Sequence, residues 1–118
     1  MWGHWISKTW AHLGQSQESG QDRQYWQVQY HLGRGRRARE AGRPAQGAME
    51  ARRALAVDPA NPWAFALLGQ CLLRMGRIGD AGAALEQART LAPANGYFVR
   101  LSLEVLHAQH DLRGRTDL

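Results

Sequence analysis

The residue types in this sequence with the most chemical potential are histidine, cysteine and arginine. His107 and His110 are three residues apart, so on a helix they share a face, and Asp111 follows directly. Two or three donors without a recognised metal motif favour solvated helix residues over a metal site. Cys71 stands beside Leu72 in an apolar stretch with no histidine placed to pair with it, which favours a small buried residue over a nucleophile.

Catalytic motifs are absent from the sequence. The segment Gly33-x-Gly35 lacks the Gly-Lys-Ser/Thr that completes a phosphate-binding loop. No HExxH, nucleophile elbow or paired-carboxylate motif occurs. The sequence therefore predicts a protein that is not an enzyme and that uses no cofactor and no metal.

Positive charge is concentrated in residues 22–53, where eight arginines face three acidic residues, a local excess of five. Guanidinium groups suit phosphates, but no aromatic residues are interleaved with the densest run and no nucleic-acid motif appears. A solvated helix face is the favoured interpretation, and nucleic acid is not an expected partner. The run comprises Arg34, Arg36, Arg37, Arg39 and Arg43.

The length and composition limit the class of protein. The chain has 118 residues, 44% hydrophobic and 21% charged, which is typical of one small soluble domain. No apolar run reaches 18 residues and no secretory signal is visible, so we expect a cytoplasmic protein, or one at the cytoplasmic face of a membrane. A single cysteine excludes an internal disulfide framework. The abundance of Ala, Leu, Arg and Gln indicates helices.

A repeat with a period of 34 residues organises the chain. The segment Pro59–Asn61 recurs as Pro93–Asn95, and Gly42–Arg43 recurs as Gly76–Arg77. Between the two prolines, Asn61 is suited to be the N-cap of a helix whose first turn contains Pro62. The apolar residues of this predicted helix are Phe65, Leu68, Leu72 and Leu73. Gly76 closes it, and a turn ending near Gly79–Asp80 leads to a second helix with a stripe of Ala81, Ala84, Leu85 and Ala88.

The pattern Phe65-x-x-Leu68-Gly69-x-x-Leu72, followed by Ala81-x-x-x-Leu85, Ala88 and Pro93, resembles the tetratricopeptide repeat. Residues 28–61 fit the same register, but His31 and Arg34 stand at apolar positions and Gly47 stands at an alanine position. Residues 96–113 resemble the first helix of a third unit and suggest a capping helix that ends at Gly114.

An amphipathic helix is predicted at the N-terminus. Its apolar face is formed by Trp2, Trp5, Ile6, Trp10 and Leu13. Because so short a helix is not stable alone in water, something must cover the tryptophans. Three surfaces could bury them: the chain's own first repeat helix near Trp26 and Tyr30, a partner protein or second copy, and a membrane interface.

These observations predict an all-α protein: a short helical-hairpin solenoid of about two repeats with a C-terminal capping helix and an N-terminal Trp-rich helix. The expected divisions are a docking helix at 1–14, a polar linker at 15–24, the repeat domain at 25–113 and a polar tail at 114–118.

The resemblance implies a groove, lined by the first helix of each unit, that binds peptide segments. The partner-binding residues expected there are Arg36, Arg39, Trp63, Gln70, Arg74, Tyr97 and Arg100, with Gln29, Leu32, Ala66, Leu73, Glu104 and His107 beside them. We expect a non-catalytic adaptor or scaffold, an accessory subunit of a larger complex, that binds an acidic or extended protein segment or a second copy of itself. The alternative is a membrane-surface subunit that docks on a lipid-embedded complex through the Trp helix.

Overall fold

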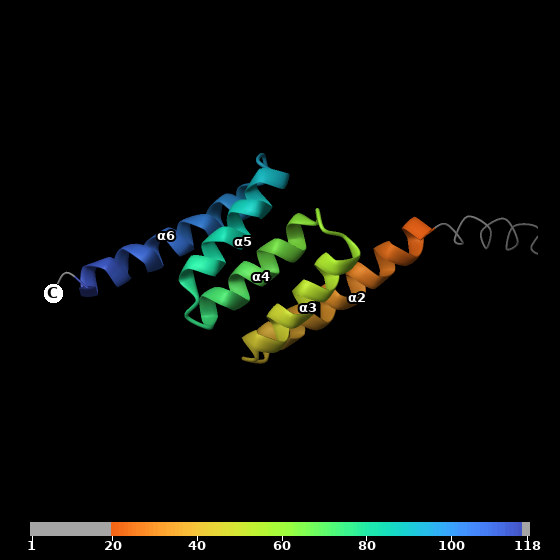
Figure 1. The fold of residues 1–118 in the computed structure, drawn as a ribbon, viewed down its shortest axis with the longest axis horizontal. Helices are drawn as coiled ribbons and strands as arrows, with labels where there is room; N and C mark the ends of the chain where they lie inside the picture. Colours follow the sequence, from red (N-terminus) through yellow and green to blue (C-terminus); the bar gives the residue numbers. More distant parts are fainter. Residues whose placement is uncertain (1–19, 117–118) are drawn as a thin grey trace, which may run out of the picture.

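The computed structural model describes residues 20–116, which form five helices and no strand. The helices are α2 (Gly20–Glu40), α3 (Pro44–Val57), α4 (Pro62–Arg74), α5 (Ile78–Leu91) and α6 (Gly96–Thr116). Helices α2 and α3 form one antiparallel hairpin, α4 and α5 form a second beside it, and α6 lies along α5 (Figure 1). The predicted all-α solenoid of two hairpins and a terminal helix is confirmed.

The two hairpins turn in the same way, because a glycine in the left-handed conformation ends each first helix. Gly42 has φ 76° and Gly76 has φ 81°, values that residues with a side chain rarely adopt. Each glycine N–H donates to the carbonyl three residues back, at 3.1 and 3.0 Å. The next residue, Arg43 or Arg77, donates to the carbonyl five residues back, at 2.8 and 2.9 Å. The sequence repeat is therefore also a repeat of backbone hydrogen bonds.

The link between the hairpins is fixed by a side-chain cap. Asn61 Oδ1 accepts a hydrogen bond from the backbone N–H of Ala64 at 3.1 Å, and Pro62 occupies the first turn of α4. At the equivalent position before α6, Asn95 Oδ1 accepts from the N–H of Tyr97 at 2.9 Å. The N-cap predicted for Asn61 is confirmed.

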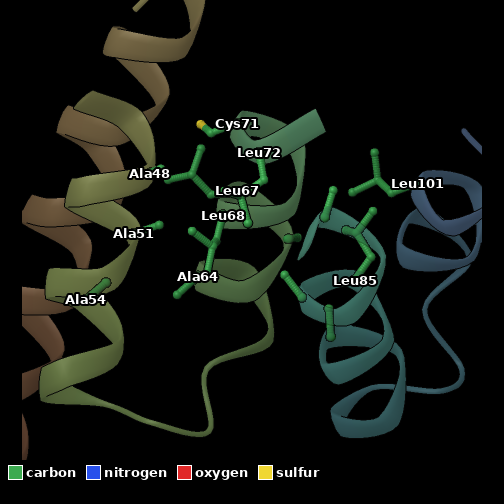
Figure 2. Packing of buried hydrophobic residues seen from close by; sticks show 14 of the residues in the cluster. Ala48, Ala51, Ala54, Ala64, Leu67, Leu68, Cys71, Leu72, Leu85 and Leu101 are labelled. Atoms are coloured by element: carbon green, nitrogen blue, oxygen red, sulfur yellow. The ribbon is translucent and has the colours of Figure 1, made fainter. Parts of the chain in front are cut away.

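The hydrophobic core runs between the helices without a break, and small residues set the distance between them. Ala48, Ala51 and Ala54 of α3 are fully buried and face α4, where Leu67 lies nearest Ala48 and Ala64 lies nearest Ala54 (Figure 2). On the other side of α4, Leu85 is 1% exposed and belongs to the same core. Alanine allows neighbouring helices to approach closely, so a short chain can bury a continuous interior.

Glycines allow close contacts between the two helices of each hairpin. A Cβ atom on Gly69 would lie 2.6 Å from Leu85 Cγ, and one on Gly47 would lie 3.1 Å from the carbonyl oxygen of Gly35. The same Cβ on Gly47 would lie 2.6 Å from Cys71 Sγ. Gly47 replaces the alanine of the repeat pattern because α2 and Cys71 leave no room for a methyl group.

Some predicted boundaries are wrong. Residues 20–24 of the predicted linker belong to α2, where Asp22 in the first turn interacts favourably with the helix dipole. The remainder of the linker and the Trp-rich segment lie outside the described residues. Helix α6 continues through Gly114 to Thr116, so the polar tail is helical over its first residues; an interior glycine costs only about 1 kcal/mol relative to alanine. Helix α5 begins at Ile78, slightly before the expected end of the turn.

Within residues 20–116, none of the helices is both long and apolar enough to cross a lipid bilayer.

Candidate protein-binding face

A chain of hydrogen bonds joins the first helix of each unit, α2, α4 and α6. The Arg39 guanidinium donates to Gln70 Oε1, and Gln70 Nε2 donates to the Tyr97 hydroxyl at 3.1 Å. Arg74 Nη1 in turn donates to the backbone carbonyl of Arg39 at 2.7 Å. Gln70 of α4 therefore hydrogen-bonds with one side chain from α2 and one from α6.

Aromatic rings extend this chain. The Trp63 ring centroid lies 5.8 Å from that of Tyr97 and 4.9 Å from that of Phe98, the latter in an edge-to-face arrangement. Phe98 is fully buried, whereas Trp63 remains 45% exposed. The indole is therefore supported from below by the core while a large part of its surface faces solvent.

Positive charge flanks the aromatic rings. Arg100 Cζ lies 5.4 Å from the Tyr97 ring centroid, a cation–π distance. Arg74 is exposed, and so is Arg36, which precedes Arg39 by three residues on α2. Arg39 is mostly covered and lies 3.8 Å from the exposed Glu40 carboxylate. We name this surface the A-helix face; it comprises Arg36, Arg39, Trp63, Gln70, Arg74, Tyr97 and Arg100.

The structure joins six of the expected binding residues through contacts, namely Arg39, Trp63, Gln70, Arg74, Tyr97 and Arg100, and it corrects two others. Leu32 is 1% exposed and Ala66 is 2% exposed, so both belong to the core and cannot line a binding surface. They point between the helices, where Leu67 and Val28 are also buried. The expected docking residues of the N-terminal segment lie outside the described residues; they are Trp2, Trp5, Ile6, Trp10 and Leu13.

A charged cluster inside the first hairpin was not predicted. Glu50 of α3 is only 6% exposed, and His31 Nδ1 lies 2.7 Å from its Oε2 atom. Arg53 Nη1 lies 2.7 Å and Arg34 Nε lies 3.4 Å from its Oε1 atom. We name these four residues the Glu50 cluster.

The 34-residue shift contained a signal for this cluster. His31 and Arg34 occupy the positions of Phe65 and Leu68 in the second hairpin, and Glu50 occupies that of Ala84. Taken singly, each polar residue is a departure from the repeat pattern. Taken together, they place an ionic contact between two helices at positions where the second hairpin has apolar residues.

The surroundings of Glu50 act on its pKa in opposite directions. Burial raises the pKa of the carboxyl, whereas the hydrogen bond with His31 and the charges of Arg53 and Arg34 lower it. The net effect lowers the pKa of Glu50, so the carboxylate is the form that the folded chain favours.

The other candidates for chemistry are placed as follows. Cys71 is fully buried, and burial raises the pKa of its thiol, although the charges of Arg39 and Arg74 lower it in part. His107 and His110 are both exposed on α6. Within the described range, no three His, Cys, Asp or Glu residues are arranged to hold a metal ion.

Two helical hairpins with the same turn, the same period and close packing at glycine and alanine define a helical-repeat protein of the solenoid type. The family model of the tetratricopeptide repeat matches residues 38–102 of this chain. The chain therefore belongs to the tetratricopeptide-repeat family, as the sequence pattern predicted. Such repeats generally mediate protein–protein interactions and are typically non-catalytic. A comparison with curated proteins gave no match.

Proposed function

We propose that this protein is a non-catalytic adaptor whose A-helix face binds an extended, acidic segment of a partner protein. The observation that supports this most directly is the chain Arg39–Gln70–Tyr97, which joins three helices beside a half-exposed tryptophan. In a larger assembly the protein acts as an accessory subunit that holds other polypeptides.

Arginine side chains that are already held in place favour a partner that carries carboxylates. Because Gln70 and the Arg39 carbonyl hold Arg39 and Arg74 in place, less side-chain freedom is lost when a carboxylate binds. Guanidinium groups pair with carboxylates through two parallel hydrogen bonds. An acidic side chain is therefore the natural ligand for the arginines of this face.

Trp63 provides the apolar anchor. Tryptophan, tyrosine and arginine are the residues that most often dominate binding energy at protein interfaces. The Trp63 ring stacks near Tyr97 and rests on buried Phe98, so it presents its exposed surface without rearrangement. A segment that carries one apolar side chain among acidic residues would use both parts of the face.

The N-terminal segment 1–14 stays a predicted second docking surface, for a partner or a second copy. The membrane-surface alternative depends on the same segment, and no observation among the described residues favours it. The A-helix face alone therefore carries the proposal.

Binding of labelled acidic peptides, measured by fluorescence anisotropy, tests this function. The probes are extended peptides that contain one tryptophan or leucine among several glutamates, with the matching glutamine peptides as neutral controls. We expect Arg74→Gln and Trp63→Ala each to weaken binding about tenfold. The matched control is Arg89→Gln on α5. Arg89 is exposed and lies outside the A-helix face, and its Nη1 atom is 3.6 Å from Oε2 of Glu86. Equal affinity for acidic and neutral peptides, or an equal loss in the Arg89 variant, would contradict the proposal.

A further inference from the structure

The arginine run 34–43 divides between two sides of the first hairpin. Arg36 and Arg39 belong to the A-helix face, whereas Arg34, Arg37 and Arg43 line a separate cavity of about 480 Å³. The rest of its lining is uncharged: Tyr30, Ala38, Ala41 and Gln46. Three arginines therefore line a cavity that has no acidic residue in its lining, and one of them, Arg34, also pairs with Glu50 outside it.

The guanidinium groups of these three arginines differ in the partners that they have within the fold. Arg34 donates to the Tyr30 hydroxyl at 2.7 Å, and its Nε atom lies 3.4 Å from Glu50. Within residues 20–116, the guanidinium groups of Arg37 and Arg43 form no ion pair or hydrogen bond. Both residues are exposed, so their charges remain available to a ligand.

At the equivalent turn of the second hairpin, an acidic residue neutralises the arginine. Arg77 occupies the position equivalent to Arg43, and its Nη2 atom lies 2.8 Å from Oδ2 of Asp80. In the first hairpin, Gln46 stands where Asp80 would be, so Arg43 loses its partner. At the position of Arg37 the second hairpin has Cys71, which is buried. A cavity lined by arginines without an acidic partner, Arg37 and Arg43, is therefore a feature that the first hairpin does not share with the second.

We propose that this cavity binds a phosphate monoester on a partner polypeptide, in the form of a phosphoserine or phosphothreonine side chain. Such a group carries close to two negative charges and three strong acceptor oxygens, which match several guanidinium forks at once. Recognition of phosphorylated segments by arginine clusters is a recurring mode of peptide binding.

The geometry favours a phosphorylated side chain over a nucleic acid. A nucleic acid binds best along a row of cations that follows several phosphates, with aromatic rings on which bases stack. Here the three arginines surround one cavity, and the one aromatic residue in its lining, Tyr30, is engaged by Arg34 through its hydroxyl. The site is thus suited to a single compact dianion.

Charge also sets the expected pH dependence. The second ionisation of a phosphate monoester has a pKa near 6, so the ligand gains its second charge as pH rises through that value. Binding should therefore strengthen between about pH 5 and pH 7, while the arginines stay protonated throughout.

The test uses the full chain and a fluorescein-labelled peptide of glycine and alanine that contains one phosphoserine. The same peptide without phosphate is the first control, and inorganic phosphate is the competitor. We expect the wild-type protein to prefer the phosphopeptide by about tenfold or more, and excess phosphate to displace it. The double variant Arg37→Gln, Arg43→Gln should abolish this preference. Because both residues are exposed, far-ultraviolet circular dichroism should show unchanged helicity.

Arg77→Gln is the matched control, because it removes an arginine from the equivalent turn and should leave the preference intact. Equal affinity for the two peptides, or an equal loss in both variants, would overturn the proposal. Tighter binding of an oligothymidylate than of the phosphopeptide would overturn it in favour of nucleic acid. The neutral and acidic peptides that probe the A-helix face should be unaffected by the double variant, so failure of one site is distinguishable from failure of the other.

Discussion

His31 Nδ1 lies 2.7 Å from Oε2 of Glu50, and this contact joins α2 to α3 where the second hairpin uses the apolar residues Phe65 and Ala84. Two neighbouring units of one solenoid therefore solve the same packing problem by different chemistry. Glu50 is buried whereas Arg34 and Arg53 remain about half exposed, so the carboxylate is the charge that has given up its hydration and depends on its partners.

Removing Glu50 alone should destabilise the fold more than replacing both His31 and Glu50 with the apolar residues of the second hairpin. We expect Glu50→Ala to lower the free energy of unfolding by about 1–3 kcal/mol, because it leaves His31 without its acceptor. The double variant His31→Phe, Glu50→Ala, which copies the second hairpin, should recover most of that loss. Urea unfolding followed by circular dichroism measures both; additive losses in the double variant would contradict this account.

The Glu50 cluster also predicts that the free energy of unfolding decreases at acidic pH. Because the pKa of Glu50 is lowered from its ordinary value of 4.5 in the folded chain, its stabilising contribution is fully present above that pH. The contribution is lost as pH falls through the lowered pKa, since protonation then favours the unfolded chain. Urea unfolding at a series of pH values should show a steeper acid decline for wild type than for Glu50→Gln. Parallel declines would show that Glu50 is not linked to folding.

Close packing at Gly69 predicts opposite effects for two glycine substitutions. Gly69→Ala places a methyl group 2.6 Å from Leu85 Cγ, and the resulting overpacking should destabilise the fold by about 1–3 kcal/mol. Gly33→Ala, inside α2, meets no atom within 4 Å and should stabilise by about 0.5–1 kcal/mol, because alanine favours a helix. Thermal unfolding compares the two variants directly. A Gly69 variant as stable as wild type would mean that α4 and α5 are further apart than described.

Burial of Cys71 predicts a thiol that is protected in the folded protein. Its side chain is fully buried and its pKa is raised from 9.0, so the reactive thiolate is scarce and inaccessible at neutral pH. Ellman's reagent should react slowly in native buffer and rapidly in urea. Rapid labelling in native buffer would show that the α3–α4 interface opens readily.

The sequence predicts well those features that depend on residues close together in the chain. Asn61 caps α4 by accepting a hydrogen bond from Ala64, three residues further along the chain. Gly42 and Gly76 end helices by adopting a positive φ. A pattern along the chain is therefore enough to find all three. The start of α2 at Gly20 was missed because Gln21–Gln24 have no apolar periodicity and only good helix propensity to indicate a helix.

Properties that depend on several helices were harder to predict. Leu32 and Ala66 were placed on the binding face because their register matches it, but packing between helices buries them. The Arg39–Gln70–Tyr97 chain could be predicted as a group of residues on one face, although not as hydrogen bonds. The Glu50 cluster required comparing three departures from the repeat together.

The central claim is that an acidic polypeptide binds across α2, α4 and α6, and nuclear magnetic resonance tests it most directly. A glutamate-rich peptide is titrated into ¹⁵N-labelled protein while the Trp63 indole N–H and the Gln70 side-chain amide are followed. The account predicts saturable shifts at both groups and at the amides around Arg74 and Tyr97, with α3 and the outer surface of α5 unchanged. Shifts confined to α3 and α5, or none at peptide concentrations that saturate the anisotropy signal, would contradict it.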